Sequence, residues 1–446
     1  MKVLKFGGTS MANAASIRKV AHIINSDPSA RYIVVSAPGK RESSDVKVTD
    51  LLYECIDERD RSGVCDAALA KVISRFGDII EGLGLELDLT PEFNVIRDQI
   101  NGGAGKDYAS SRGEFLSGIV TAKLLGARFV DAGDVIRFDM EGNFDSETTN
   151  CLVAERVLGN ERVVVPGFYG KMPNGRIKTF SRGGSDVTGA IIARGVNAEV
   201  YENWTDVDGF MTVDPRIQKN PQIIEMLTYK ELRELSYMGA NVLHPESIFP
   251  VRKADIPINI RNTFNPSAPG TMIVPTKKFM RGEYKRTDRT ITGIAGKTDF
   301  AAVYVEKSLM NSELGFARRL LKILERHNIL LEHLPSGIDT MTVVIDAAAQ
   351  RKEEISAVLR EIKEELSPSS IEFYEGIALI AVVGHGMNRK TGTSARVFGA
   401  LAAANVNIRM IDQGSSELNI IIGVENADYQ KAIRAIYAEF EGGNGN

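Results

Sequence analysis

The first residues that could do chemistry lie at the N-terminus, in the run KVLKFGGTS. Lys5 lies near the end of a short apolar run and precedes Gly7 and Gly8, and Ser10 closes the stretch. Because the lysine comes before the glycines, the phosphate loops GxxxxGKS/T and GxGxxG are both excluded. A lysine near the end of a parallel strand still points toward the crevice where such sheets bind ligands, and glycine N–H groups followed by a helix suit phosphate. The run predicts an anion site, and the alternative is a plain glycine turn.

Two later stretches carry a similar mixture of glycines, hydroxyls and charges. SRGGSDVTGA supplies Arg182, whose planar guanidinium suits a carboxylate or phosphate, and then Ser185 and Asp186 at the start of an expected helix. The alternative for the last two is that they only cap that helix. Thr205 and Asp206 follow an expected strand and could hold a sugar or base edge, with an ordinary turn as the alternative.

A carboxylate in SRGEFLSG completes the set. Glu114 could receive the ammonium of a substrate, and the alternative is an exposed glutamate at a helix start. Together the stretches place two glycine-rich anion sites, a lysine, arginines and carboxylates in one α/β domain. Phosphoryl transfer needs such a set, because its catalysis consists mainly of positioning and of neutralising charge.

The elements that must position these residues alternate between strand and helix patterns up to roughly residue 270. Apolar residues at helical spacing, from Ile17 to Ile24, separate two apolar runs at 3–6 and 32–35, which is the βαβ pattern of a parallel sheet. The polar stretch from Ser36 to Asp50 breaks this rhythm. Further strands are expected at 127–130, 163–165, 199–203 and 256–260.

Composition and charge exclude several classes of protein. The 446-residue chain has a formal net charge of −4, and no basic run stands out as a nucleic-acid site. No run approaches the roughly 20 apolar residues of a membrane span, and no early apolar region marks a signal peptide. Three cysteines and five histidines without ligand spacing argue against a disulfide framework or a protein-bound transition metal. A cytoplasmic protein with reduced thiols is expected.

An internal repeat follows a Lys- and Arg-rich stretch at 277–289. Gly315 returns as Gly392 and Asn328 returns as Asn405, with a constant offset (392 − 315 = 77) that apolar positions also follow. Each copy reads as strand, loop, glycine, helix, asparagine, strand, glycine turn and strand. The pattern predicts a small α+β module that is present twice.

These motifs resemble those of the aspartokinases, in the amino-acid kinase family. KFGGTS, VVSA, the GE of SRGEFLSG, SRGGSD, TDVDG and VLHP come in the family's order, and the doubled module is similar to its tandem ACT domains. The resemblance implies an amino-acid kinase fold, an α/β domain with a mostly parallel central sheet sandwiched by helices, followed by two ferredoxin-like α+β ACT domains. The expected boundaries are a catalytic domain at 1–275, a linker at 276–290, and ACT domains at 291–368 and 369–446.

The resemblance also implies the reaction, in which ATP phosphorylates the side-chain carboxylate of L-aspartate to give 4-phospho-L-aspartate. Lys5 would neutralise the transferring phosphoryl group, and Asp186 would orient Lys5. The substrate carboxylate is already ionised at neutral pH, so no base has to remove a proton, and the difficulty is the approach of two anions. Lys5 and Mg²⁺, held mainly by the ATP phosphates rather than by a protein metal site, would offset that repulsion.

Matching family positions gives two groups of expected ligand contacts. Glu114 would hold the substrate ammonium and Arg182 its α-carboxylate, while the stretch 36–50 would close over the substrate. Many relatives have a lysine where Asn241 stands and some a tyrosine where Met211 stands, so one ATP contact is weakened, replaced or supplied elsewhere. The expected ATP-binding residues are Lys5, Gly7, Gly8, Ser10, Ser185, Thr205, Asp206, Met211, Arg216 and Asn241. The expected substrate-binding residues are Ser36, Ala37, Thr49, Glu114, Arg182 and Asp186.

Tandem ACT domains imply feedback control by a pathway amino acid, at the first step of lysine, threonine and methionine biosynthesis. Glu332 and Asp339 could bind an ammonium, which favours lysine over threonine as the effector, and the alternative is that both are solvated surface acids. Pairing of ACT modules across subunits implies a homodimer or a dimer of dimers. The expected effector residues are Met310, Gly315, Phe316, Ala317, Glu332, Ser336, Gly337, Ile338 and Asp339.

Two other functions stay open. The chain could phosphorylate another acceptor, as a glutamate or acetylglutamate kinase, although the doubled ACT tail argues against this. It could also be a non-catalytic amino-acid sensor on a degenerate kinase domain, but the intact Lys5, Arg182 and Asp186 argue against decay.

Overall fold

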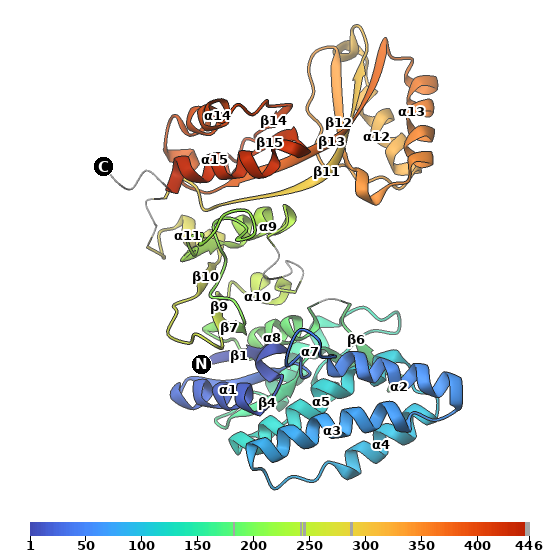
Figure 1. Ribbon diagram of the computed structural model, residues 1–446, viewed down its shortest axis with the longest axis vertical. Helices are drawn as coiled ribbons and strands as arrows, with labels where there is room; N and C mark the ends of the chain where they lie inside the picture. Colours follow the sequence, from blue (N-terminus) through green and yellow to red (C-terminus); the bar gives the residue numbers. More distant parts are fainter. Residues whose placement is uncertain (182, 241–242, 244–246, 286–288, 442–446) are drawn as a thin grey trace. The chain divides into compact units, whose positions relative to one another are not determined.

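The computed structural model describes residues 1–181, 183–240, 243, 247–285 and 289–441, and the chain divides into two compact units (Figure 1). Each unit is assembled from more than one segment of the sequence. The N-terminal unit comprises Met1–Phe210, Ile223–Tyr229 and Val242–Lys285. The C-terminal unit comprises Met211–Gln222, Lys230–Asn241 and Arg286–Asn446.

The N-terminal unit is built on an eight-stranded sheet with the order β3-β4-β2-β1-β7-β9-β10-β8. All neighbouring strands run parallel except β9 and β10, so the expected mostly parallel sheet is confirmed. The strands are β1 (Lys2–Phe6), β2 (Ala30–Val35), β3 (Arg128–Phe129), β4 (Val163–Pro166), β7 (Val200–Thr205), β8 (Met226–Thr228), β9 (Ile258–Asn262) and β10 (Thr271–Val274). A separate hairpin consists of β5 (Tyr169–Lys171) and β6 (Ile177–Thr179).

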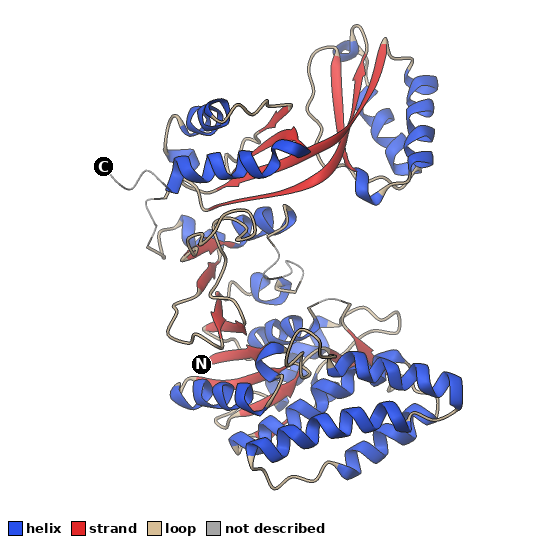
Figure 2. Ribbon diagram, in the orientation of Figure 1, coloured by secondary structure: helices blue, strands red, loops and turns tan. Residues whose placement is uncertain are grey.

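Helices cover both faces of this sheet (Figure 2). One face, including Leu4, Ile33 and Val164, shares a hydrophobic core with the first five helices. The opposite face carries α8 (Gly184–Gly195), which contacts β1, β2 and β7. The other helices of this unit are α1 (Ala14–Ser26), α2 (Val48–Ser62), α3 (Asp66–Leu83), α4 (Thr90–Asn101), α5 (Lys106–Leu125), α6 (Ala132–Val135), α7 (Ser146–Arg156), α10 (Phe249–Lys253) and α11 (Thr276–Met280).

The predicted helix after the first strand is α1, and its sequence explains where it starts. The Asn13 side chain accepts a hydrogen bond from the Ser16 N–H at 2.9 Å, which caps the first turn. Ile17, Val20 and Ile24 are buried against the sheet, as their helical spacing predicts. No helix among the described residues is long and apolar enough to cross a membrane.

The C-terminal unit contains a five-stranded antiparallel sheet with the order β12-β11-β13-β15-β14. Its strands are β11 (Gly293–Glu306), β12 (Thr340–Asp346), β13 (Ser370–Val383), β14 (Met410–Asp412) and β15 (Asn419–Glu425). Its helices are α12 (Phe316–Arg326), α13 (Lys352–Leu366), α14 (Thr393–Ala403) and α15 (Tyr429–Glu441), together with α9 (Tyr229–Tyr237) from Lys230 onward.

The two α+β modules repeat at the level of single residues. Helices α12 and α14 keep the predicted offset at both ends (393 − 316 = 77 and 403 − 326 = 77). Gly315 and Gly392 precede these helices with φ of 78° and 83°, a left-handed conformation that favours glycine. Asn328 and Asn405 follow them with φ of 53° and 51°. The four positions that identified the repeat therefore all hold left-handed backbone conformations.

The two modules share their long strands. Ile294 in the first half of β11 packs in the core with α14 and α15, whereas Val303 in its second half packs in the core with α12 and α13. Strand β13 does the reverse, since Phe373 packs against the first module and Ile380 lies in the second core. The first module is thus inserted into the second, rather than simply preceding it.

Candidate active site

An ion pair between Lys5 and Asp186 forms the centre of the candidate site. Lys5 lies near the end of β1 on the face that α8 covers, and its ammonium is 2.5 Å from Oδ1 of Asp186. Lys5 is only 7% exposed, so its charge is largely removed from water. Gly183, with φ of 54°, precedes α8, so Ser185 and Asp186 stand in the first turn and do not cap it. The alternative that they only cap this helix is therefore wrong.

The glycine loop after β1 joins three of the predicted motifs. A side-chain carbon at Gly7 would lie 3.6 Å from Nζ of Lys5, which places the ammonium beside this loop. The Thr9 hydroxyl donates to Oδ2 of Asp206 at 3.2 Å, which connects the loop to the end of β7. KFGGTS and TDVDG therefore meet at the carboxyl end of the parallel strands, where such sheets bind ligands.

The third motif at this loop is the polar stretch 36–50. The N–H of Gly39 donates to the Gly8 carbonyl at 2.8 Å, and a side chain at Gly39 would approach that carbonyl to 2.7 Å, so glycine is required there. Arg75 on α3, 4% exposed, donates to the Gly39 carbonyl at 2.7 Å and pairs with Asp45 at 2.7 Å. The stretch 36–50 therefore contacts the glycine loop directly, and the buried Arg75 stabilises it through Gly39 and Asp45.

Glu114 lies in the middle of α5 and is 6% exposed. The alternative that it is an exposed glutamate at a helix start is therefore wrong. Burial raises the pKa of Glu114 to about 8, although a backbone hydrogen bond from Ala37 and the charges of Arg112 and Lys5 act in the opposite direction. Its Oε2 atom is shielded and has no hydrogen-bond partner among the described residues. A cation reaching this carboxyl would satisfy that acceptor.

Arg112 stabilises the segment that carries Glu114. Its guanidinium lies over three aromatic rings, at 4.8 Å from Tyr108, 4.6 Å from Phe115 and 5.1 Å from Tyr169. It is 6% exposed and donates to the Ser111 hydroxyl. Stacking on aromatic faces lets an arginine keep its charge in a buried site.

The structure brings several other predicted residues to the same region. The Ser36 N–H donates to the carbonyl at the end of β1, and Ala37 packs against Gly113 next to Glu114. Thr49 stands in the first turn of α2, and Ser185 is buried. Ser10 differs, because it is fully buried and bonds the Thr263 hydroxyl at 2.8 Å, so its side chain has a structural partner.

The positions of four predicted ligand-binding residues relative to Lys5 are not described. Arg182 and Asn241 lie outside the described residues, as does most of the VLHP motif. Met211 and Arg216 belong to the C-terminal unit, where Arg216 is exposed and pairs with Asp214 at 2.6 Å. These residues stay predictions.

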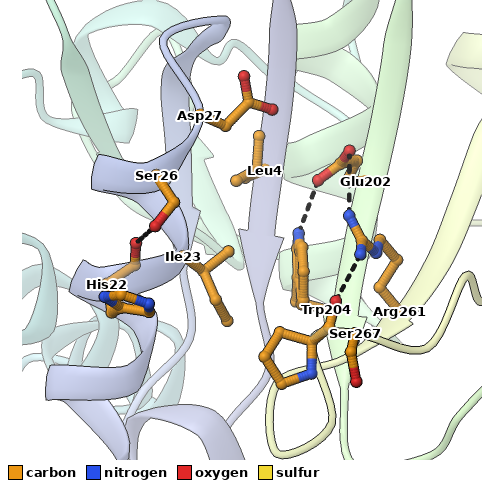
Figure 3. Close-up of a pocket in the computed structure, with 10 residues that line it drawn as sticks. Leu4, His22, Ile23, Ser26, Asp27, Glu202, Trp204, Arg261 and Ser267 are labelled. Carbon is orange, nitrogen blue, oxygen red and sulfur yellow. Dashed lines mark hydrogen bonds and ion pairs between the residues drawn. The ribbon is translucent and has the colours of Figure 1, made fainter.

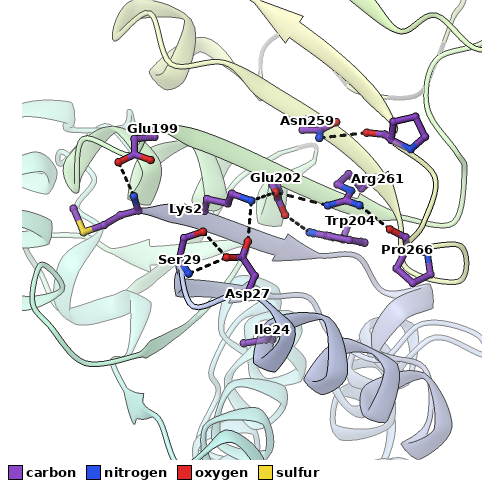
Figure 4. A network of polar contacts seen from close by, with 12 residues as sticks. Lys2, Ile24, Asp27, Ser29, Glu199, Glu202, Trp204, Asn259, Arg261 and Pro266 are labelled. Atoms are coloured by element: carbon purple, nitrogen blue, oxygen red, sulfur yellow. Dashed lines mark hydrogen bonds and ion pairs between the residues drawn. The ribbon is translucent and has the colours of Figure 1, made fainter.

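A second polar cluster occupies the other face of the sheet, away from Lys5. Leu4, Glu202 and Trp204 point to that face and line a pocket of about 460 Å³ with residues of α1 (Figure 3). Glu202 accepts from the Trp204 indole at 2.9 Å and pairs with Lys2 at 3.0 Å, and Arg261 stacks on Trp204 at 4.4 Å (Figure 4). These paired charges connect β1, β7 and β9, so we interpret the cluster as stabilising the sheet.

Comparison with known proteins decides the family. The model of the amino acid kinase family matches residues 1–262, and an ACT domain model matches residues 380–440. The chain is 40% identical over 466 aligned residues to Aspartokinase 3 of Bacillus subtilis (strain 168), covering 99% of each chain. The chain belongs to the aspartokinases of the amino acid kinase family.

Solved aspartokinase structures agree with this fold. The crystal structure of Clostridium acetobutylicum aspartate kinase matches with a TM-score of 0.91 and 48% identity, over 99% of this chain and 100% of that chain. E. coli aspartokinase III in complex with aspartate and ADP matches with a TM-score of 0.72 and 25% identity, over 99% of this chain and 100% of that one. The expected aspartokinase family and fold are confirmed.

The sequence did not point to two residues of this candidate site, Asn203 and Arg75. Asn203 contacts both Lys5 and Asp186, and Arg75 supports the loop at Gly39. Asn203 left a signal, because it is a polar residue within a strand whose neighbours Tyr201 and Trp204 are buried. Arg75 left none, since it lies in a helix far away in the sequence.

The raised pKa of Glu114 predicts a pH-dependent stability. The folded protein keeps this proton up to about pH 8, whereas the unfolded chain loses it near the ordinary value of 4.5. Glu114 therefore contributes stability that is fully present below about pH 4.5 and is lost as the pH rises through about 8. In thermal melts without ligands, the parent should lose stability relative to Glu114→Gln as the pH rises between these values. Parallel curves for the two proteins would contradict the raised pKa.

Proposed function

We propose that this chain transfers the γ-phosphoryl group of ATP to the side-chain carboxylate of L-aspartate, giving 4-phospho-L-aspartate and ADP. A carboxylate oxygen forms the new bond to phosphorus, and the bond to the bridging oxygen of ADP breaks. The observation that carries the proposal is the Lys5–Asp186 pair beside the Gly7 loop, in a chain that matches aspartokinases over its full length. E. coli aspartokinase III, solved with aspartate and ADP, supports the choice of substrates.

Each assigned role follows from charge. Lys5 stabilises the transferring phosphoryl group, while the N–H of Gly8 holds an ATP phosphate, whose Mg²⁺ arrives as part of the nucleotide. The expected contact from the Gly7 N–H is not kept, because that N–H already donates to the Trp204 carbonyl at 3.0 Å. Glu114 takes the aspartate ammonium, which ionises this carboxyl and supplies the cation that its shielded oxygen lacks. Arg182 takes the α-carboxylate as its planar guanidinium allows.

Release of ADP with different acceptors tests the proposal. We expect turnover with aspartate, and much less with glutamate or N-acetylglutamate. Lys5→Ala should lower kcat by roughly a hundredfold or more, the typical cost of removing one preorganised charge from a transition state. Lys123→Ala, a lysine in the last turn of α5, serves as the matched control and should keep parental activity. No turnover of the parent with aspartate would overturn the proposed function, and an unchanged Lys5→Ala would overturn the role of Lys5.

We further propose that lysine inhibits the enzyme by binding at the segment 332–339 of the first ACT module. Asp339 has a shielded Oδ1 atom without a hydrogen-bond partner among the described residues, which is the acceptor that a lysine ammonium requires. Glu332 already accepts a hydrogen bond from the Tyr237 hydroxyl at 2.7 Å. Gly315 precedes α12, whereas Met310 and Phe316 lie in the module core. E. coli aspartokinase III has been solved with lysine and aspartate, which supports this effector.

The same module presents apolar side chains that suit a second copy of the chain. Leu314 is 98% exposed, Leu330 is 80% exposed and Ile338 is 71% exposed. Exposed apolar side chains can pack against a partner, and Ile338 lies within the proposed effector segment. We propose a homodimer that pairs these surfaces, so that effector binding and subunit contact are adjacent.

Inhibition and sedimentation measured on the same samples test the regulatory proposal. Lysine in the millimolar range should inhibit the parent, and Asp339→Asn should weaken inhibition by roughly tenfold or more, because a hydrogen bond to a charged group is lost. Glu353→Gln, an exposed acid on α13, is the control and should respond like the parent. Inhibition by threonine alone would contradict the effector, and a monomer at all concentrations would contradict the pairing.

Two further assignments belong to this proposal. We propose a catalytic domain at 1–275, a linker at 276–290 and ACT modules at 291–368 and 369–446, except that the start of β11 belongs to the second module and the start of β13 to the first. A cytoplasmic location is in keeping with Cys55 and Cys65, whose thiols are free and buried.

A further inference from the structure

We propose that Asn203 is a positioning residue for phosphoryl transfer, whose amide holds the Lys5 ammonium and the Asp186 carboxylate in one arrangement and directs a remaining N–H of Lys5 toward the phosphates. This role rests on the proposed function, because it concerns the same reaction.

The strand register places Asn203 next to Lys5. Lys5 on β1 is the direct neighbour of Asn203 on β7, and since side chains alternate along a strand, both face α8. Asn203 is 4% exposed, so its amide must find partners inside the protein. Its Nδ2 donates to Oδ1 of Asp186 at 3.0 Å, and its Oδ1 accepts from Nζ of Lys5 at 3.4 Å.

The chemistry of the two partners leaves the amide a single orientation. A carboxylate only accepts hydrogen bonds and an ammonium only donates them, so the N–H₂ must face Asp186 and the carbonyl must face Lys5. Asn203 therefore connects the two charges. If the amide were flipped, its carbonyl would face the Asp186 carboxylate and its N–H₂ would face the Lys5 ammonium, and neither pair could form a hydrogen bond. Leucine has a similar size but can do neither.

A count of donors shows what the arrangement achieves. An ammonium has three N–H groups, and the described partners Asp186 and Asn203 engage two of them. Nζ also lies close to Gly7 in the glycine loop after β1. The third N–H is therefore available to donate to a phosphate bound at this loop. With two donors fixed, the direction of the third is fixed as well. Loss of the amide frees the ammonium to turn, which should slow the chemical step more than it weakens binding.

Two substitutions test this role, and the second keeps the size and shape of the side chain. Asn203→Leu should lower kcat by roughly tenfold or more with KM values for ATP and aspartate changed less than threefold, as expected for a group that acts mainly in the transition state. Asn203→Asp introduces a carboxyl that matches the amide only when protonated, since it then donates to Asp186 and accepts from Lys5. Its kcat relative to the parent should therefore rise by roughly tenfold as the pH is lowered.

The groups that face Asn203 limit how this pH profile is interpreted. Among the described residues, β1 contributes Lys5, α8 contributes Asp186, and β9 contributes the apolar Ile260 as register neighbour. On β7 itself, Tyr201 donates to the Asp186 carbonyl, and burial raises the pKa of its phenol well above the ordinary value. The change therefore concerns one ammonium and two carboxyls. Asn259→Leu makes the same chemical change on the other face of the sheet, where Asn259 is the register neighbour of Glu202. This variant should keep the parental kcat, and the ratio of its kcat to that of the parent should not change with pH.

The outcomes separate this role from the proposed function. A parent that turns over aspartate, together with a pH-dependent ratio for Asn203→Asp, supports the positioning role. A parent without turnover overturns the function itself. An active parent with a pH-independent ratio for Asn203→Asp, or with full kcat in Asn203→Leu, overturns only the role of Asn203. Melting temperatures of all variants show whether an effect comes from lost folding.

Discussion

The ion pair between Lys5 and Asp186 is the interaction on which the rest of the catalytic unit depends. A lysine that is 7% exposed loses most of its hydration, so acceptors in the protein have to replace the water around its ammonium. Asp186 supplies one acceptor at 2.5 Å and Asn203 another at 3.4 Å. These two contacts require β1 to lie in the interior of the sheet, β7 to be its neighbour, and the first turn of α8 to pack against both strands. The pair then holds the Lys5 ammonium beside the glycine loop before any nucleotide arrives.

Strand β7 shows how one short segment serves both the sheet and the chemistry. Glu202 faces one side, where it pairs with Lys2 and accepts from the Trp204 indole. Asn203 faces the other, where it contacts Lys5 and Asp186. Because successive side chains alternate, the two polar groups stay apart although they are neighbours in the chain. A shift of one residue in the register of β7 would exchange them, so the sheet fixes the site.

Local patterns were sufficient to predict the parallel sheet, α1 and the repeat, because apolar spacing, glycine and asparagine carry that information within a few residues. The inserted ACT module was not foreseen, since the division of β11 between two cores depends on pairing with β13, between 64 and 90 residues away (370 − 306 = 64 and 383 − 293 = 90), and such pairing leaves no local pattern. The burial of Glu114 followed from the packing of α5, whose apolar residues are not confined to one side. Glycine motifs marked the position of the site, but tertiary packing supplied Asn203 and Arg75.

Lys5 and Asp186 act as a unit in phosphoryl transfer, and a double-mutant cycle on kcat measures this directly. Lys5→Ala, Asp186→Asn and the double variant would be compared with the parent under single-turnover conditions. If Asp186 acts by orienting Lys5, removing it after Lys5 is gone should cost little, and the coupling free energy should be about 1–3 kcal/mol. Losses that multiply, with coupling near zero, would show that the two residues act independently and would contradict the central claim.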